Sequence, residues 1–197
     1  HTKNIIPANY RITREDEVLA PSERLKNNIE AIKVLKRLNK ENRNASKEEQ
    51  DILSKYVGWG GLSDVFDEER GGQWQEARGF LKENLSLSEY EAAKESTLTA
   101  FYTPKVVIDA IYHTLSDMGF ESGNILEPSI GTGRFIGNLP LSMQNSKFYG
   151  IELDIISGQI AKKLYPNSNI QVKGFEETAF SNNLFDIAVG NVPFGEY

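Results

Sequence analysis

From residue 99 onward, short apolar runs alternate with helical stretches, and this alternation constrains the fold more than any other feature. Four runs are predicted to be strands, at residues 125–126, 148–154, 169–175 and 184–191. Alternating strands and helices build a parallel sheet with right-handed crossovers. Ligands of such sheets bind beyond the carboxyl ends of the strands. We therefore expect an α/β domain whose site lies where these strands end.

The first half of the chain is predicted to be helical. Three serines are expected to begin helices there, two of them in capping boxes: Ser22, Ser46 with Glu49, and Ser88 with Glu91. In the second half, Thr103 and Pro104 predict the start of a helix that runs to Met118. We therefore expect an N-terminal extension (1–20), a helical region (21–98) and an α/β part (99–197).

Composition narrows the classes of function. No apolar run approaches the ~20 residues that span a bilayer, so we expect no membrane partner and a cytoplasmic location. The chain has no cysteine, which excludes disulfides and thiolate metal sites, and its 2 histidines predict no metal centre. The net charge is −6. One basic stripe, Lys26, Lys33, Arg37 and Lys40, is more typical of a solvated helix face than of a phosphate-binding surface.

The segment ILEPSIGTGRFIG, residues 125–137, places an acid directly before a glycine-rich turn. Glycines in such a turn let a ligand approach the backbone closely. Glu127, at the end of the first strand, disfavours a pyrophosphate and suits a ligand with a cationic or amino group. Glu152 ends the next strand, where an acid can hold ribose hydroxyls. Together these features favour a nucleoside-bearing ligand over a purely structural turn.

Four motifs, FYTP, LEPSIGTGRF, YGIELD and GNVPFG, follow one another along the second half. In order and spacing they resemble the N6-adenine DNA methyltransferases that use S-adenosylmethionine, with the γ-type arrangement of motifs. The stretches NNIEAIKVLKRL and YVGWGGL resemble the large methylase–helicase proteins of phages and conjugative elements. The resemblance implies a Rossmann-like class I methyltransferase core with strand order 3-2-1-4. It also implies S-adenosylmethionine as cofactor, DNA as substrate and a bacterial or phage-encoded protein.

The resemblance also implies a set of residues that line the cofactor. They are Phe101, Tyr102, Thr103, Glu127, Pro128, Gly131, Gly133, Phe135, Glu152, Phe175 and Glu176. In this set Glu127 belongs near the ammonium group and Glu152 at the ribose. Phe175 and Glu176 fall where the family contacts adenine, although the usual Gly-Asp reads Gly174-Phe175 here. Phe135 is equally consistent with a core aromatic.

The implied catalytic motif is Asn191, Val192, Pro193 and Phe194. The lone pair of adenine N6 is delocalised into the ring, so this nitrogen is a poor nucleophile. The Asn191 side-chain oxygen and the Val192 carbonyl would accept its N–H groups and direct the lone pair at the methyl group. Phe194 would offer a face to a base flipped out of a duplex. Positioning would then supply most of the acceleration. In isolation, Asn-x-Pro is more often a turn that ends a strand.

Two other functions stay open on the sequence. A protein glutamine N5-methyltransferase uses a similar Asn-Pro-Pro-Tyr motif to hold a planar amide. The second alternative is a catalytically silent cofactor-binding module that positions a fused helicase. The Glu-Pro-Ser-x-Gly-Thr-Gly form of the glycine motif and the helical first half favour DNA.

We further expect the chain to belong to a longer parent protein, because it lacks an initiator Met and stops just after the catalytic motif. The parent would carry the C-terminal methyltransferase, target-recognition and helicase regions. Residues 1–197 alone are expected not to methylate DNA. The strand at residues 185–189 would then be a sheet edge, which proteins normally cover. We expect another copy, N-terminal residues or a crystal neighbour to protect it.

Overall fold

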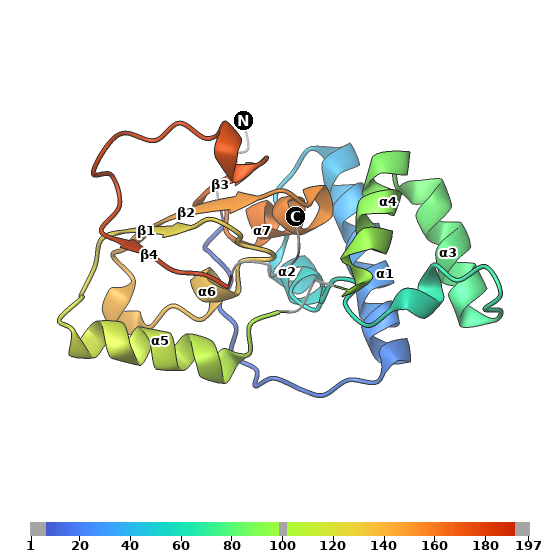
Figure 1. Ribbon diagram of the computed structural model, residues 1–197, viewed down its shortest axis with the longest axis horizontal. Helices are drawn as coiled ribbons and strands as arrows, with labels where there is room; N and C mark the ends of the chain where they lie inside the picture. The colour runs from blue at the N-terminus through green and yellow to red at the C-terminus, as the bar shows by residue number, and fades with distance from the viewer. Residues whose placement is uncertain (1–6, 99–101, 192–197) are drawn as a thin grey trace.

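In residues 7–98 and 102–191, which the computed structural model describes, four parallel strands form one sheet (Figure 1). They are β1 (Asn124–Glu127), β2 (Lys147–Glu152), β3 (Asn169–Val172) and β4 (Ile187–Ala188). Their order is β3-β2-β1-β4, and every pairing is parallel. The predicted α/β fold and strand order are confirmed. The order reverses between β1 and β4, so the switch point of the sheet lies between these two strands.

The helices divide into two groups. The first half contains α1 (Pro21–Glu41), α2 (Lys47–Leu53), α3 (Gln73–Asn84) and α4 (Leu87–Glu95), with short 3-10 turns at Ser63–Val65 and Ser96–Leu98. The second half contains α5 (Lys105–Asp117), α6 (Arg134–Gly137) and α7 (Ile155–Leu164), with 3-10 turns at Leu141–Met143 and Phe175–Glu177. The predicted change from a helical half to an alternating half is therefore observed.

The capping predictions were only partly right. Ser46 and Glu49 form the expected capping box at α2. The box at α4 is Ser86 with Glu89, so the predicted pair Ser88 and Glu91 was wrong by two residues. Ser22 was also wrong as a cap, because Ala20 caps α1 and Pro21 is its first residue. A proline suits that first position, where its missing N–H would have no helical partner.

The two faces of the sheet have different coverings. Ile125 and Phe148 are paired neighbours on β1 and β2 and belong to the main hydrophobic core. Leu126 and Tyr149, the next pair, face the opposite way because side chains alternate along a strand. On that second face Tyr149 makes edge-to-face contacts with Phe180 and Phe185, whose ring centroids lie 6.2 and 5.3 Å away. The segment between β3 and β4 thus covers this face.

The helical region packs onto the sheet through α7, which contacts β2 and β3 on one side and α1 and α2 on the other (Figure 1). The Gln50 side chain of α2 donates to the carbonyls of Lys163 and Leu164 at the end of α7, both at 3.3 Å. The Lys163 ammonium in turn donates to the Arg43 carbonyl at 2.6 Å. A single cluster of buried hydrophobic residues includes members of both halves.

Residues 7–20, here called the strap, join distant parts of the chain. The N–H groups of Tyr10 and Ile12 donate to the carbonyls of Leu164 and Gly137, both at 2.8 Å. Further along, Asp16 accepts from the N–H of Lys105 and pairs with Arg134. Asp16 therefore binds the first N–H of α5, whereas the sequence predicted Thr103 as its cap. The residue before Lys105 is Pro104, the observed cap position, which offers no side-chain hydrogen bond.

None of the helices in the described part of the chain is long and apolar enough to cross a membrane.

Candidate active site

Glu127 ends β1 beside the switch point of the sheet. Its side chain is 3% exposed, and its Oε2 atom has no hydrogen-bond partner among the described residues. Burial raises the pKa of this carboxyl well above its ordinary value, and the nearby charge of Glu152 raises it further. An unpaired buried carboxylate is unstable unless it is protonated or meets a cation. Glu127 is therefore the strongest sign of a ligand-binding site in the described structure.

Glu152 ends β2, the neighbouring strand. Its two carboxylate oxygens accept backbone N–H groups, from Gly131 at 2.6 Å and from Asp154 at 2.8 Å. Burial raises the pKa of Glu152, and the two N–H groups oppose this rise because they stabilise the charged form. Glu152 thus ties the end of β2 to the glycine turn after β1. A carboxylate has about four lone-pair sites, so hydroxyl groups of a ligand can still bind it.

The glycine turn between β1 and α6 has a left-handed backbone, which favours glycine, at Gly131 and Gly133. Gly133 has φ of 83° and is the cap residue of α6. A methyl group at Gly133 would lie 2.4 Å from Cε2 of Tyr165, which is far inside contact distance. The turn is therefore packed tightly against the core behind it, and its other side is the part that can meet a ligand.

The chain after β4 passes directly beside Glu127. The N–H of Val189 donates to the Leu126 carbonyl at 2.8 Å. A methyl group at Gly190 would lie 3.6 Å from Cδ of Pro128 and 3.8 Å from Cγ of Glu127. Asn191 follows and is exposed. The structure therefore brings Glu127, Pro128 and Asn191 to one end of the sheet, whereas Val192, Pro193 and Phe194 lie outside the described residues.

The other residues predicted to line the cofactor differ in where they lie and in how exposed they are. Phe101 lies outside the described residues, and Thr103 is half-buried just before α5. Phe135 is 1% exposed and packs edge-to-face on Tyr112, whose hydroxyl donates to the Phe135 carbonyl at 2.7 Å. Its ring is thus a core side chain in this structure. Phe175, 47% exposed, and Glu176, also exposed, follow the end of β3 and stand at the same edge of the sheet.

Sequence reasoning missed two residues that shape the site. Asp154 donates its N–H to Glu152 and accepts from the Ser157 N–H at 2.7 Å, so it caps α7. An aspartate just before an apolar helix is a recognisable signal for such a cap. Tyr56 lies two residues before the GWGG sequence and is buried, and burial, followed by the charge of Asp154, raises its pKa. Nothing in the local sequence places Tyr56 near Asp154.

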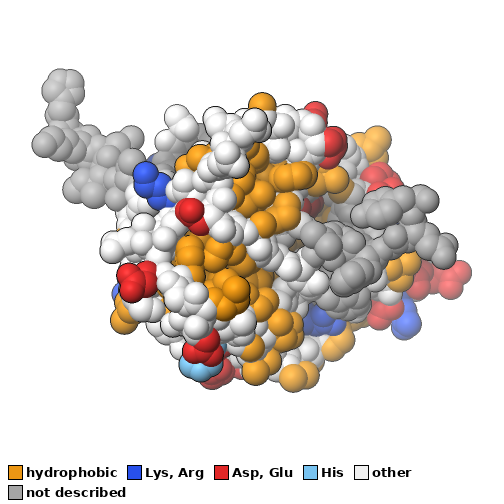
Figure 2. All heavy atoms as spheres, turned by 60° about the vertical axis from the view of Figure 1, so that its left-hand side comes forward, with side chains coloured by type: hydrophobic (Ala, Val, Ile, Leu, Met, Phe, Trp, Pro, Cys, Tyr) orange, Lys and Arg blue, Asp and Glu red, His pale blue; other side chains and the backbone are white. Residues whose placement is uncertain are grey.

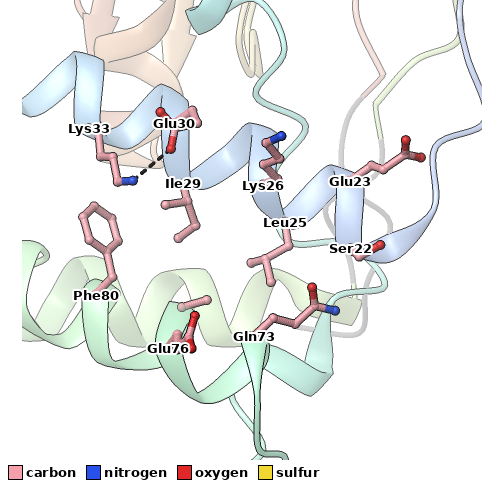
Figure 3. A pocket seen from close by; sticks show the side chains of 11 residues that line it. Ser22, Glu23, Leu25, Lys26, Ile29, Glu30, Lys33, Gln73, Glu76 and Phe80 are labelled. Atoms are coloured by element: carbon pink, nitrogen blue, oxygen red, sulfur yellow. Dashed lines mark hydrogen bonds and ion pairs between the residues drawn. The ribbon is translucent and has the colours of Figure 1, made fainter.

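Two of the four residues in the basic stripe on α1 are paired with acids. Lys33 bonds Glu30 at 2.8 Å and lies over the ring of Phe80, and Arg37 bonds Glu49 at 2.8 Å. Lys26 and Lys33 border a hollow of about 500 Å³ between α1 and α3 that also has acidic and apolar walls (Figure 3). This mixture of charges fits a solvated helix face better than a track for phosphates.

We expect the double substitution Lys26→Gln and Lys33→Gln to leave DNA binding by the full-length protein within about twofold, because these ammonium groups face a mixed-charge hollow. The measurement is the apparent dissociation constant at several salt concentrations. If both lysines contacted phosphates, the salt slope would fall by roughly 1.8, since each contact contributes about 0.9. A fall of that size would contradict the solvated-face interpretation.

Hydrophobic side chains also gather on the face of the molecule shown in Figure 2. A shallow hollow of about 500 Å³ is lined by α5. Val106 and Val107 of this helix are 73% and 44% exposed.

Among the described residues, β4 pairs only with β1. The expected protection of residues 185–189 stays a prediction.

Three curated relatives share parts of this sequence. The chain is 33% identical over 150 residues to the Defense against restriction protein B of Escherichia phage P1. It is 38% identical over 94 residues to the Type II methyltransferase M.CvrRI of Paramecium bursaria Chlorella virus XZ-6E, and 31% identical over 105 residues to the Modification methylase CviBIII of Paramecium bursaria Chlorella virus NC1A. These matches cover 75%, 48% and 51% of this chain, but only 5%, 24% and 27% of the relatives.

One solved structure is also similar. It is a Listeria monocytogenes protein described as a class I S-adenosylmethionine-dependent methyltransferase, with a TM-score of 0.43 and 13% sequence identity, over 89% of this chain and 61% of that one. No protein-family model matches the chain. In the part of the chain that the structure describes, no group of three or more His, Asp or Glu side chains is arranged to hold a metal ion. The chain is similar over about half of its length to a viral type II methyltransferase and to a viral modification methylase.

Proposed function

We propose that this chain binds S-adenosylmethionine at the carboxyl ends of β1 and β2 and forms part of a DNA methyltransferase that acts on N6 of adenine. Glu127 is the observation that carries the proposal. Its buried carboxyl has an oxygen without a partner in the described residues, at the switch point of the sheet. A cationic group of a ligand would stabilise the carboxylate there.

The residues present fit this cofactor. The buried oxygen of Glu127 would accept an ammonium group, and Glu152 would accept ribose hydroxyls with the lone pairs that Gly131 and Asp154 leave free. The glycine turn gives the ligand close access to the backbone. When bound, S-adenosylmethionine supplies a methyl group on a positively charged sulfur.

The relatives support DNA as the substrate, since two of them are named as a type II methyltransferase and a modification methylase. The specificity for adenine rests on the Asn-x-Pro-Phe motif. Asn191 is exposed at the end of the chain segment that passes Glu127, so its amide oxygen is available to a base. By accepting an N–H of the amine, Asn191 would orient the nitrogen lone pair and hold the base in place.

The proposal is tested by supplying the full-length protein with S-adenosylmethionine that carries a labelled methyl group and with unmethylated DNA. Digestion to nucleosides is expected to yield label in N6-methyldeoxyadenosine. Label in methylated cytosine would contradict the adenine assignment. Label only on glutamine of an added release-factor-like protein would contradict DNA as substrate. Binding of S-adenosylhomocysteine without any transfer would instead identify a silent cofactor-binding module.

A further inference from the structure

The turn at residues 56–62, which contains the GWGG sequence, is held firmly by α1. The side chain of Asn28 donates to the Gly58 carbonyl at 2.6 Å and accepts from the Val57 N–H at 2.9 Å. Asn28 is fully buried, so both ends of its amide depend on this turn. Arg24 adds a hydrogen bond to the Gly60 carbonyl at 2.9 Å. The backbone of the 56–62 turn is therefore fixed relative to α1.

The ring of Tyr102 lies between this turn and the glycine turn of the site. A methyl group at Gly58 would lie 3.3 Å from Cε2 of Tyr102 and 3.4 Å from its hydroxyl. On the other side of the ring, a methyl group at Gly131 would lie 3.5 Å from Cε1. Two glycines from separate parts of the chain thus leave a slot for one aromatic ring. Gly131 is the residue whose N–H binds Glu152.

The pKa values of Tyr56 and Tyr102 both respond to the charge of Asp154, which lies beside Glu152. Burial raises the pKa of Tyr102, the charge of Asp154 raises it further, and hydrogen bonds with Ser157 and Thr132 oppose the rise. The pKa of Tyr56, in the 56–62 turn, is raised first by burial and then by the charges of Asp154 and Tyr102. Asp154 itself donates to Glu152. Through Gly58 and the ring of Tyr102, the helical half therefore reaches Gly131, whose N–H binds Glu152.

We propose that the 56–62 turn forms a wall of the cofactor site, with Gly58 as a positioning residue that holds Tyr102 against the glycine turn. This inference rests on the proposed binding of S-adenosylmethionine. It gives the GWGG segment a role in ligand binding, because Gly58 is the point where Tyr102 meets the helical half. Any side chain at Gly58 would push the ring toward Gly131 and narrow the space above the glycine turn.

Gly58→Ala tests this role, and Gly61→Ala is its matched control. The two glycines belong to the same turn and have φ of 67° and 68°, so an alanine meets the same backbone strain at both positions. At Gly61 the added methyl would meet only the guanidinium of Arg24, at 3.5 Å. We expect Gly58→Ala to weaken S-adenosylhomocysteine binding by the full-length protein about tenfold, or 1.4 kcal/mol. Gly61→Ala should leave the affinity for S-adenosylhomocysteine within about twofold of the wild type. Both variants should lower the melting temperature by similar amounts, because the backbone strain is the same.

A double-mutant cycle shows whether Gly58 acts through Tyr102. In a Tyr102→Ala background, Gly58→Ala should weaken binding no further, because the ring that it displaces is gone. Equal affinities of the two glycine variants, or additive effects of Gly58→Ala and Tyr102→Ala, would overturn the inference while the wild type still binds. A wild type that does not bind S-adenosylhomocysteine would overturn the proposed function and the inference together.

Discussion

Replacing Asn191 with alanine is expected to lower methyl transfer to DNA about 100- to 1,000-fold, with S-adenosylhomocysteine binding changed less than about threefold. The amide oxygen is proposed to contact only the target amine, so its loss acts on the reacting geometry and leaves cofactor binding intact. Losses of this size are typical when one preorganised polar contact to a reacting group is removed. The two readouts are single-turnover methylation and calorimetric binding in the full-length protein.

Asn182 provides the control for this substitution. It is an exposed asparagine in the segment that leads into the amino end of β4, and Asn182→Ala should change neither readout. Asn191 would lose its assigned role if Asn191→Ala lowered cofactor binding as much as transfer. It would also lose that role if both alanine variants kept full activity.

Replacing Glu127 with glutamine is expected to stabilise the ligand-free protein at pH 7 to 8 and to weaken cofactor binding about 10- to 100-fold. The first effect follows from the buried carboxyl, whose Oε2 has no partner among the described residues. The second follows from the loss of a charge-assisted hydrogen bond, which is worth roughly 1.5–3 kcal/mol. The same side chain thus lowers stability and favours binding, a common opposition at functional sites.

The raised pKa of Glu127 also predicts how the stability of the wild type changes with pH. The folded-state pKa of Glu127 is raised, first by burial and then by Glu152, so the folded chain holds its proton at pH values where the unfolded chain has released it. Stability from this group is fully present below the unfolded pKa and is lost as pH rises through the folded pKa. The wild type should therefore lose melting temperature on going from pH 5 to pH 8, by about 2–4 °C per kcal/mol. The melting temperature of the Glu127→Gln variant should fall less over the same pH range.

Glu121→Gln is the matched control, because Glu121 is an exposed carboxyl near the other end of β1. It should reproduce the melting profile and the cofactor affinity of the wild type. A Glu127→Gln protein whose melting temperature falls with pH as steeply as that of the wild type would show that Glu127 is not the buried acid responsible.

The sequence was most informative where the signal is local. Hydrophobic alternation predicted the parallel α/β sheet, whereas its strand order was implied by the resemblance to class I methyltransferases. Glu127 and Glu152 were predicted to stand at the ends of successive strands, where the structure places them. The capping box of Ser46 and Glu49 is also a signal within four residues. Such features depend on the chain a few residues away, so they can be read without knowing the tertiary structure.

The features that could not be predicted depend on contacts between distant segments. The residue that binds the first N–H of α5 is Asp16, far back in the strap, and no local pattern indicates this. The position of Tyr102 between Gly58 and Gly131 requires the packed arrangement of both halves. Ser88 and Glu91 have the right spacing for a capping box, but Ser86 and Glu89 have it as well and are the pair that the structure uses. Spacing alone does not choose between them.

The strap has a consequence for the order in which the molecule folds. Several of its partners lie more than a hundred residues further along the chain, for example Leu164 for Tyr10, Gly137 for Ile12 and Ser168 for Asn9. During synthesis, α1 and α2 can form as soon as they emerge, whereas these contacts must wait until the ribosome has passed residue 168. Closing such long loops is slow, because chain entropy is lost before the contacts compensate for it. The strap is thus made before α1 but is among the last segments to reach its native place.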